Sequence, residues 1–284
     1  MQYRRPTLCA IALLLFAPLA LAQPLWADTR SPFEIDLAID LPITLGAGGL
    51  GLAAELIKKD LKAPDRTYDR MSVNRFDRPV TYYFSAGSQI ASDVLVYTTL
   101  ALPVVLDLID VAVSKPGAGY RGFGKAVMVM AETVMVALLP NQMVKFAVRR
   151  PRPYLFNPKV SAETKAGIDG QFSFFSQHTA LAFAIATAYG YIFTKRHPTS
   201  PWRYVVWAGT MSLATSTSLL RVFAGRHYWS DVITGAAVGA CIGFLVPYLH
   251  TLSRKPAGKS GETRFSLQPT IGRGLTQVQL LVQY

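Results

Sequence analysis

Charged residues are scarce in this chain of 284 residues. Only 16% are Asp, Glu, Lys or Arg, against about 25% in ordinary soluble domains, whereas 51% are hydrophobic. A soluble protein of this composition would have too few polar side chains to cover its surface. The composition therefore argues against a soluble globular protein and favours an integral membrane protein.

Cysteine and acidic residues are also few. The two cysteines, Cys9 and Cys241, both lie in apolar stretches, which excludes a disulfide framework and a cysteine-based metal site. Acidic residues number 17 against 29 basic ones, a formal net charge of +12. Such an excess suits an anionic partner. Because the sequence holds no nucleic-acid motif, we expect lipid headgroups or phosphate rather than nucleic acid.

The N-terminus has the organisation of a secretory signal peptide. Arg4 and Arg5 precede a short apolar core, and Ala-Leu-Ala at residues 20–22 resembles a cleavage site. We therefore predict a signal peptide over residues 1–22. An uncleaved anchor helix is the alternative, although the core is shorter than the roughly 20 residues of a full span.

Apolar segments suited to membrane helices follow residue 88, but each contains polar residues. Acidic side chains inside such segments are costly unless they face the bundle interior, so we expect Asp93, Asp107 and Glu132 to point inward. The sequence thus predicts an all-α integral membrane bundle of about five to six helices over residues 89–250. The clearest spans are 90–113, 126–148, 179–193, 204–220 and 232–250.

The regions flanking this bundle are more ambiguous. Residues 35–57 combine alternating apolar and acidic positions with clustered glycines, which allow close helix contact. We interpret them as a helix lying on or re-entering the membrane, with a full span as the alternative, within an N-terminal segment and polar linker over residues 23–88. Residues 251–284 form a basic linker and then alternate apolar and polar positions, which predicts a short β-like hairpin.

Three polar clusters interrupt the predicted helices. One loop joins the helices that carry the first two clusters, and two further spans return the chain to the same face at the third. We therefore expect the clusters to meet at one end of the bundle. They comprise Lys145 with Arg152, Ser176 with His178, and Arg221 with His227 and Asp231.

These residue types suit phosphoryl transfer without a metal or cofactor. Three fixed cations can bind the non-bridging oxygens of a phosphoryl group. A neutral imidazole can attack phosphorus while a carboxylate on its other nitrogen fixes the tautomer. We assign these roles to His227 and Asp231, which a helix would place one turn apart. His178 can protonate the leaving group, and the surrounding cations argue against a zinc site.

The order and spacing of the clusters resemble the type 2 phosphatidic acid phosphatase superfamily, which also contains bacterial acid phosphatases and vanadium haloperoxidases. The shared pattern is Lys, six residues, Arg-Pro; then Ser-x-His; then Arg, five residues, His, three residues, Asp. The resemblance implies a catalytic group of His227, His178 and Asp231 and a phosphate-binding group of Lys145, Arg152, Ser176 and Arg221.

Two positions depart from the family pattern. The family usually has Pro-Ser-Gly-His where this chain has Phe175 and Gln177 around the serine, and usually has serine in place of Leu220. Gln177 puts a side chain where glycine lets the backbone approach phosphate closely. Because no reacting group is lost, we still expect activity.

The predicted function is hydrolysis of a phosphate monoester or diphosphate of a membrane lipid through a phosphohistidine. Undecaprenyl diphosphate, phosphatidic acid and phosphatidylglycerol phosphate are candidate substrates. The alternatives are a phosphotransferase or vanadate-dependent oxidase on the same scaffold, and an envelope protein that binds lipid phosphates with weak catalysis. We expect an inner membrane of bacterial type. The site is periplasmic if the signal peptide is cleaved and residues 35–57 do not cross the membrane. If they do cross, the site is cytoplasmic with a cleaved signal peptide and periplasmic with an uncleaved one.

Overall fold

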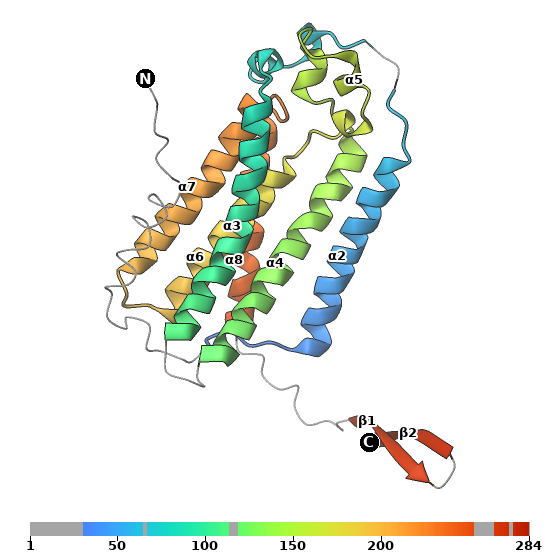
Figure 1. The fold of residues 1–284 in the computed structure, drawn as a ribbon, viewed down its shortest axis with the longest axis vertical. Helices are drawn as coiled ribbons and strands as arrows, with labels where there is room; N and C mark the ends of the chain where they lie inside the picture. The colour runs from blue at the N-terminus through green and yellow to red at the C-terminus, as the bar shows by residue number, and fades with distance from the viewer. Residues whose placement is uncertain (1–30, 65–66, 114–118, 253–263, 273–274, 284) are drawn as a thin grey trace, which may run out of the picture. The chain divides into compact units, whose positions relative to one another are not determined.

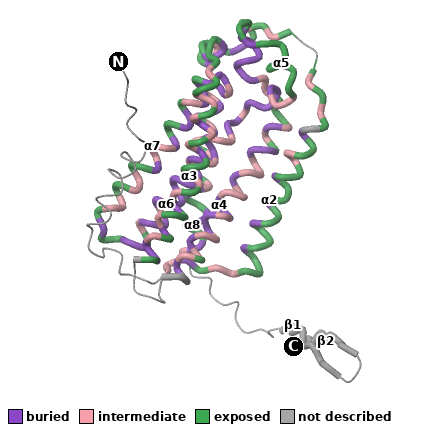
Figure 2. The backbone as a smooth tube through the Cα atoms, in the orientation of Figure 1, coloured by how far each residue is buried: buried purple, intermediate pink, exposed green. Residues whose placement is uncertain are grey.

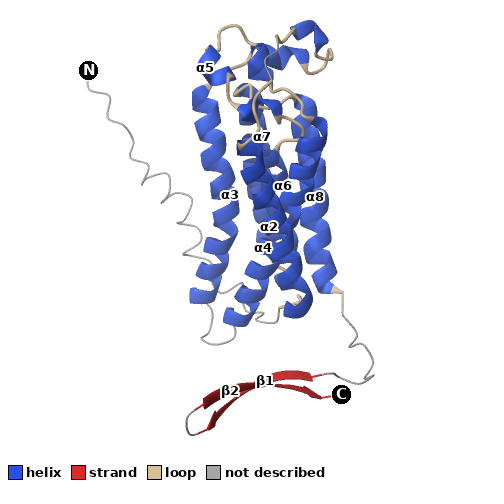
Figure 3. Ribbon diagram, turned by 90° about the vertical axis from the view of Figure 1, so that its right-hand side faces the viewer, coloured by secondary structure: helices blue, strands red, loops and turns tan. Residues whose placement is uncertain are grey.

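The computed structural model describes residues 31–64, 67–113, 119–252, 264–272 and 275–283, and it divides into two units at residue 251. The predicted signal peptide, residues 1–22, lies outside the described residues. The first unit is a bundle of six long helices and one short one (Figures 1 and 3). The helices are α2 (Leu37–Lys59), α3 (Ala86–Val113), α4 (Gly119–Val148), α5 (Ala162–Lys165), α6 (Gln177–Arg196), α7 (Trp202–Phe223) and α8 (Trp229–Thr251).

The described part of this unit is all-helical, as predicted, and each of the five predicted spans corresponds to one of the helices α3, α4, α6, α7 and α8. Four helices are long and apolar enough to cross a membrane: α2, α3, α4 and α8. Short 3-10 helices connect the long ones at the end of the bundle that carries α5 (Figure 1). They are η1 (Arg70–Ser72), η2 (Arg78–Tyr82), η3 (Pro153–Phe156) and η4 (Ile168–Gln171).

Helix α2 is continuous over 23 residues and lies beside α4 (Figure 1). Asp36 caps its N-terminus by accepting a hydrogen bond from the backbone of Ala38, and Asp40 is buried. These are the acidic residues that suggested an interfacial or re-entrant segment. By length and composition α2 is instead a candidate span, the alternative that the sequence left open.

Helix α6 is buried in the middle of the bundle and packs closely against α8 (Figure 2). The contact runs along a stripe of Gly235, Gly239 and Gly243 on α8. A Cβ atom on Gly239 or Gly243 would collide with a carbonyl oxygen of α6. Small residues permit this close backbone approach, which fixes the start of α8 against the start of α6.

The acidic side chains within the helices largely point inward, as predicted. Asp107 is buried and pairs with Arg196 at 2.7 Å, and Glu132 is buried and pairs with His250 at 3.0 Å. Asp93 differs, because its side chain is partly exposed at the opposite end of the bundle and contacts two of the predicted site residues.

The second unit contains the strands β1 (Arg264–Gly272) and β2 (Leu275–Gln283). They pair antiparallel, with Arg264 opposite Gln283 and Gly272 opposite Leu275. This is the segment for which alternating polarity predicted a β-like hairpin.

Candidate active site

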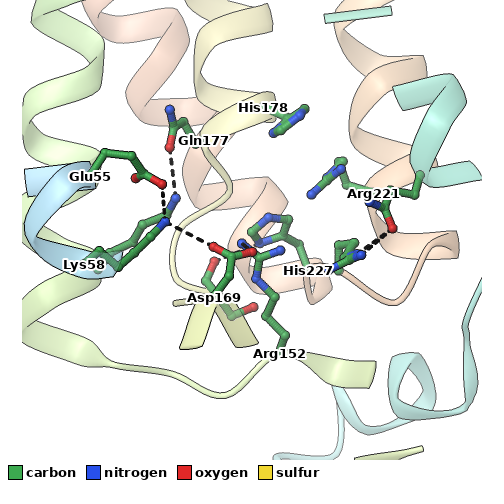
Figure 4. Close-up of polar contacts among 12 residues, drawn as sticks. Glu55, Lys58, Arg152, Asp169, Gln177, His178, Arg221 and His227 are labelled. Carbon is green, nitrogen blue, oxygen red and sulfur yellow. Dashed lines mark hydrogen bonds and ion pairs between the residues drawn. The ribbon is translucent and has the colours of Figure 1, made fainter. Parts of the chain in front are cut away.

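The structure brings the three predicted clusters together at one end of the bundle, as Figure 4 shows for Arg152, His178, Arg221 and His227. Lys145 lies in the last turn of α4, and His178 in the first turn of α6. Arg221 lies in the last turn of α7, and Asp231 in the first turn of α8. Each side chain is therefore held at a helix end, on a scaffold fixed by packing further along the bundle.

Arg152 reaches this group because α4 ends before it. Arg149 adopts a left-handed conformation, with φ of 45°, directly after the helix, and Pro151 disfavours helical backbone at the residue before it. Arg152 is extended, and its backbone N–H donates to the Gly170 carbonyl at 2.7 Å. The predicted helix end between Lys145 and Arg152 is thus confirmed.

Three buried cations surround the site: Lys145, Arg152 and Arg221. The Nε atoms of Arg152 and Arg221 are buried and have no hydrogen-bond partner within the described residues. Unpaired buried donors cost free energy, so both guanidinium groups retain donor capacity for an anion.

The tautomer of His227 follows from its contacts. Its Nδ1 atom lies 2.8 Å from the Ser173 carbonyl oxygen, which can only accept, so Nδ1 carries the proton and Nε2 carries the lone pair. The described residues offer no hydrogen-bond partner to Nε2. His227 is 1% exposed; burial first, and then Arg152, Arg221 and Lys145, hold the pKa of its imidazole well below the usual range.

The predicted direct pairing of His227 with Asp231 is wrong in its geometry. His227 precedes α8 instead of lying on it, and Nδ1 is 3.7 Å from the Asp231 carboxylate. Asp231 Oδ2 instead accepts hydrogen bonds from the Ser173 hydroxyl and the Tyr228 backbone N–H. Asp231 therefore acts on His227 at longer range and by holding the Ser173 segment.

Arg150 is a site residue that sequence reasoning missed. It donates to Asp231 Oδ1 at 2.6 Å and to Asp77 Oδ2 at 2.7 Å. Although burial raises the pKa of Asp77, hydrogen bonds from Asn74, Ser230 and Arg150 lower it overall. The signal was present in the adjacent arginines before Pro151, but nothing in the sequence showed which of them turns inward.

His178 and Arg221 share one carboxylate. His178 Nε2 lies 2.8 Å from Asp93 Oδ1, and Arg221 donates to the same oxygen at 3.1 Å. Arg221 also donates to the Ser92 hydroxyl at 3.1 Å. Asp93 was predicted to face inward, but its position beside the predicted acid was not foreseen.

Ser176 is the N-cap of α6, and its hydroxyl oxygen accepts from the backbone and side chain of Thr179. Its backbone N–H donates to the Asp231 carbonyl at 3.1 Å. Because the hydroxyl only accepts in these contacts, its hydrogen is still available to a phosphate oxygen, the role that the resemblance implies.

Two residues outside the motifs also enter the site. Asp169, in η4, pairs with Arg152 at 2.8 Å and with Lys58 at 3.1 Å. Burial raises the pKa of Asp169, but Arg152, Lys58 and Lys145 lower it well below the usual range. Lys58 was missed because the sequence suggested that α2 stood apart from the bundle.

A possible ligand set for a metal lies elsewhere. Within the described ranges, Asp40, Glu132 and His250 bring three ligand atoms within 4.8 Å. Both ring nitrogens of His250 are already hydrogen-bonded, to the Glu34 carbonyl and to Glu132. We interpret the cluster as a polar contact joining α2, α4 and α8.

Known proteins resemble this chain in part. Residues 126–255 match the PAP2 superfamily. A lipid A 1-phosphatase of Porphyromonas gingivalis is 34% identical over 152 residues, which are 51% of this chain and 29% of that protein. A probable diacylglycerol pyrophosphate phosphatase 1 of Schizosaccharomyces pombe is 32% identical over 151 residues, 45% of this chain and 52% of that protein. The chain therefore spans about half or less of these curated relatives.

A solved structure shows a weaker likeness. The crystal structure of a transmembrane PAP2 type phosphatidylglycerolphosphate phosphatase from Bacillus subtilis aligns with 76% of this chain and 98% of that one. Its sequence identity is 18% and its TM-score is 0.46.

Proposed function

We propose that this chain, whose residues 126–255 match the PAP2 superfamily, is a membrane lipid phosphatase that transfers a phosphoryl group to His227. The observation that carries the proposal is the state of His227. Its Nδ1–H is held by the Ser173 carbonyl, and the neutral ring lies among Lys145, Arg152 and Arg221, all buried. A neutral nucleophile beside preorganised cations is what attack on an anionic phosphate requires.

The first step forms a bond from His227 Nε2 to phosphorus and breaks the bond from phosphorus to the leaving oxygen. Lys145, Arg152 and Arg221 hold the charge on the phosphoryl oxygens, and the Ser176 hydroxyl can donate to one of them. Asp231, 3.7 Å from Nδ1, stabilises the positive ring that forms. His178, oriented by Asp93, gives a proton to a leaving alkoxide.

The second step returns the enzyme to its starting state. His178, now deprotonated, takes a proton from water, and the hydroxide attacks phosphorus as the bond to Nε2 breaks. Inorganic phosphate leaves and His227 is neutral again. These residues account for every proton and bond in the cycle, and a metal ion is not part of the proposal.

Location supports a lipid as the substrate. Four helices are candidate membrane spans, and the site lies at one end of the bundle, where a lipid headgroup would lie. Undecaprenyl diphosphate, phosphatidic acid and phosphatidylglycerol phosphate are the substrates to test, and we propose a periplasmic site in an inner membrane.

The test is phosphate release from a lipid panel by detergent-purified protein with a chelator present. We expect release by the wild type and none by His227→Ala, while His197→Ala, at the far end of α6, stays active. Equal release from His227→Ala and wild type would exclude the phosphohistidine. Binding without turnover would favour a lipid-phosphate-binding protein, and bromination with added vanadate an oxidase.

A further inference from the structure

Lys58 is a fourth buried cation, contributed by a helix outside the matched region of residues 126–255. It lies in the last turn of α2 and is 6% exposed. Lysines are almost never so buried unless they are paired. Its Nζ lies 2.5 Å from Glu55 Oε1 and 3.1 Å from Asp169 Oδ1. Lys58 therefore points toward the site, and its contacts are with carboxylates.

Asp169 marks an anion position between Lys58 and Arg152. One carboxylate oxygen pairs with Lys58 and the other with Arg152 at 2.8 Å. The Asp169 side chain is 47% exposed, so it can swing aside without leaving a buried cavity. Two oxygens of a phosphate group could then bridge the same cations. Figure 4 shows Lys58 and Arg221 on opposite sides of this position, so it is offset from Arg221.

Gln177 connects Lys58 to the reacting site. Its side-chain oxygen accepts from Lys145 at 3.0 Å and from Gln142 at 3.2 Å, and Gln142 also donates to Glu55 at 3.0 Å. A glycine, usual in the family at this position, would remove the acceptor of the Lys145 hydrogen bond, whereas Gln142 would keep Glu55. Gln177, which departs from the family pattern, thus forms a polar wall with Gln142 and with Glu55 of α2.

A groove of about 570 Å³ between α2 and α4 ends at this wall, within the roughly 300–1,000 Å³ of ligand pockets. Its floor is apolar and includes Gly48 and Gly51 of α2. Glu55, Gln142 and Gln177 line its polar end. An apolar chain lying in this groove would bring its headgroup to these three residues, next to Lys58, which pairs with Glu55.

We propose that Lys58 and Arg152, beside Gln177, form a leaving-group subsite for a second phosphate, so that the preferred substrates are lipid diphosphates with the chain in the α2–α4 groove. This inference rests on the proposed function. The terminal phosphorus bonds to His227 Nε2, the bond to the bridging oxygen breaks, and a lipid monophosphate leaves. Lys58 stabilises the charge on that leaving phosphate, Asp169 moves aside, and water then releases inorganic phosphate from His227.

The experiment compares farnesyl diphosphate with farnesyl monophosphate, which share one chain, using the full-length protein in detergent with chelator. We expect Lys58→Met to lower kcat/KM on the diphosphate about tenfold to hundredfold, the range for a hydrogen bond to a charged group. On the monophosphate the loss should stay under about threefold. Lys58→Arg should retain the preference, and Lys62→Met, an exposed lysine beyond α2, should match the wild type.

Equal losses on both substrates, or none on either, would overturn the subsite. If Lys58→Met does not fold, the wild type still decides: inorganic pyrophosphate should inhibit monophosphate hydrolysis at about tenfold lower concentration than inorganic phosphate, and equal inhibition would overturn the proposal. Failure of the proposed function looks different, because the wild type would then release no phosphate or His227→Ala would release as much.

Discussion

Burial of the neutral imidazole of His227 makes the stability of the protein depend on pH. Its pKa is held well below the usual range, whereas in the unfolded chain it lies at about 6.5. The unfolded state therefore binds more protons than the folded state below pH 6.5, and stability falls as the pH drops.

We expect the wild type to lose thermal stability between pH 7 and pH 5 more steeply than His227→Asn, which cannot titrate. The difference should reach at most about 1.4 kcal/mol per pH unit. Thermal denaturation in detergent at a series of pH values measures it. Parallel curves for the two proteins would show that the pKa of His227 is the same in the folded and unfolded states.

Arg150 positions the residues behind His227 without touching the substrate. It bridges Asp231 and Asp77, both nearly inaccessible to solvent, and loss of one partner from such a pair costs about 3–5 kcal/mol. We expect Arg150→Met to lower the melting temperature and to reduce kcat about tenfold or more while KM changes little.

The neighbouring Arg149, which is exposed, is the matched control. Steady-state kinetics of Arg149→Met should match the wild type. An equal loss of kcat in both variants would mean that net charge near the site matters and that the bridge does not.

Single residues also show how far the sequence could predict the site. Lys145, Arg152, His178, Arg221 and His227 were identified because their spacing places them at successive helix ends. The role of Ser173 depends on its backbone carbonyl, which every residue has, so no side-chain pattern could reveal it. The pairing of Lys58 with Asp169 was hidden because the two residues are 111 positions apart in the chain.

At the scale of helices, the contact between α6 and α8 fixes the positions of their first turns, which carry His178 and Asp231. A Cβ on Gly239 would collide with the Ala180 carbonyl, and overpacking of this kind costs about 1–3 kcal/mol. We expect Gly239→Ala to lower both the melting temperature and the activity, because His178 and Asp231 lie at the starts of the two helices.

Gly209, on the exposed side of α7, has open space where its Cβ would lie. Gly209→Ala should therefore keep the stability and activity of the wild type when the two variants are compared by thermal denaturation and phosphate release. Equal melting temperatures for Gly239→Ala and Gly209→Ala would contradict this, because they would show that α6 and α8 can move apart without loss of stability.

The positions of the helices in the sequence were easier to predict than the partners of the polar residues within them. Long apolar stretches identified α3, α4, α6, α7 and α8. Helix α2 was harder because Asp36 and Asp40 interrupt its hydrophobicity. One of them caps the helix and the other lies 3.8 Å from His250, so both are satisfied by partners that a local pattern does not show.

At the scale of the whole bundle, the direction of α2 constrains the membrane topology. Its last turn carries Lys58 into the site, whereas Glu34, just before it, hydrogen-bonds the end of α8 at 2.8 Å. If α2 crosses the membrane, residues before it lie on the face opposite the site. A periplasmic site then excludes export of the N-terminus and so excludes cleavage after residue 22.

We expect the site to be periplasmic, which labelling of single cysteines in intact cells can test. In a background of Cys9→Ser and Cys241→Ala, a membrane-impermeant maleimide should label Lys159→Cys, at the site end. Thr199→Cys, in the exposed turn between α6 and α7, should react only after permeabilisation. The reverse pattern would place the site in the cytoplasm, where a cleaved signal peptide is compatible with it.

The packing of α2 has a consequence for how such enzymes can diversify. Helix α2 packs chiefly against α4, whereas the helix starts that carry His178 and Asp231 are fixed by α6 against α8. Substitutions in α2 away from Glu55 and Lys58 therefore act on the helices that carry His178 and Asp231 only through α4. If the proposed subsite at Lys58 is right, changes in α2 would alter substrate preference while His178, His227 and Asp231 keep their places in the other helices.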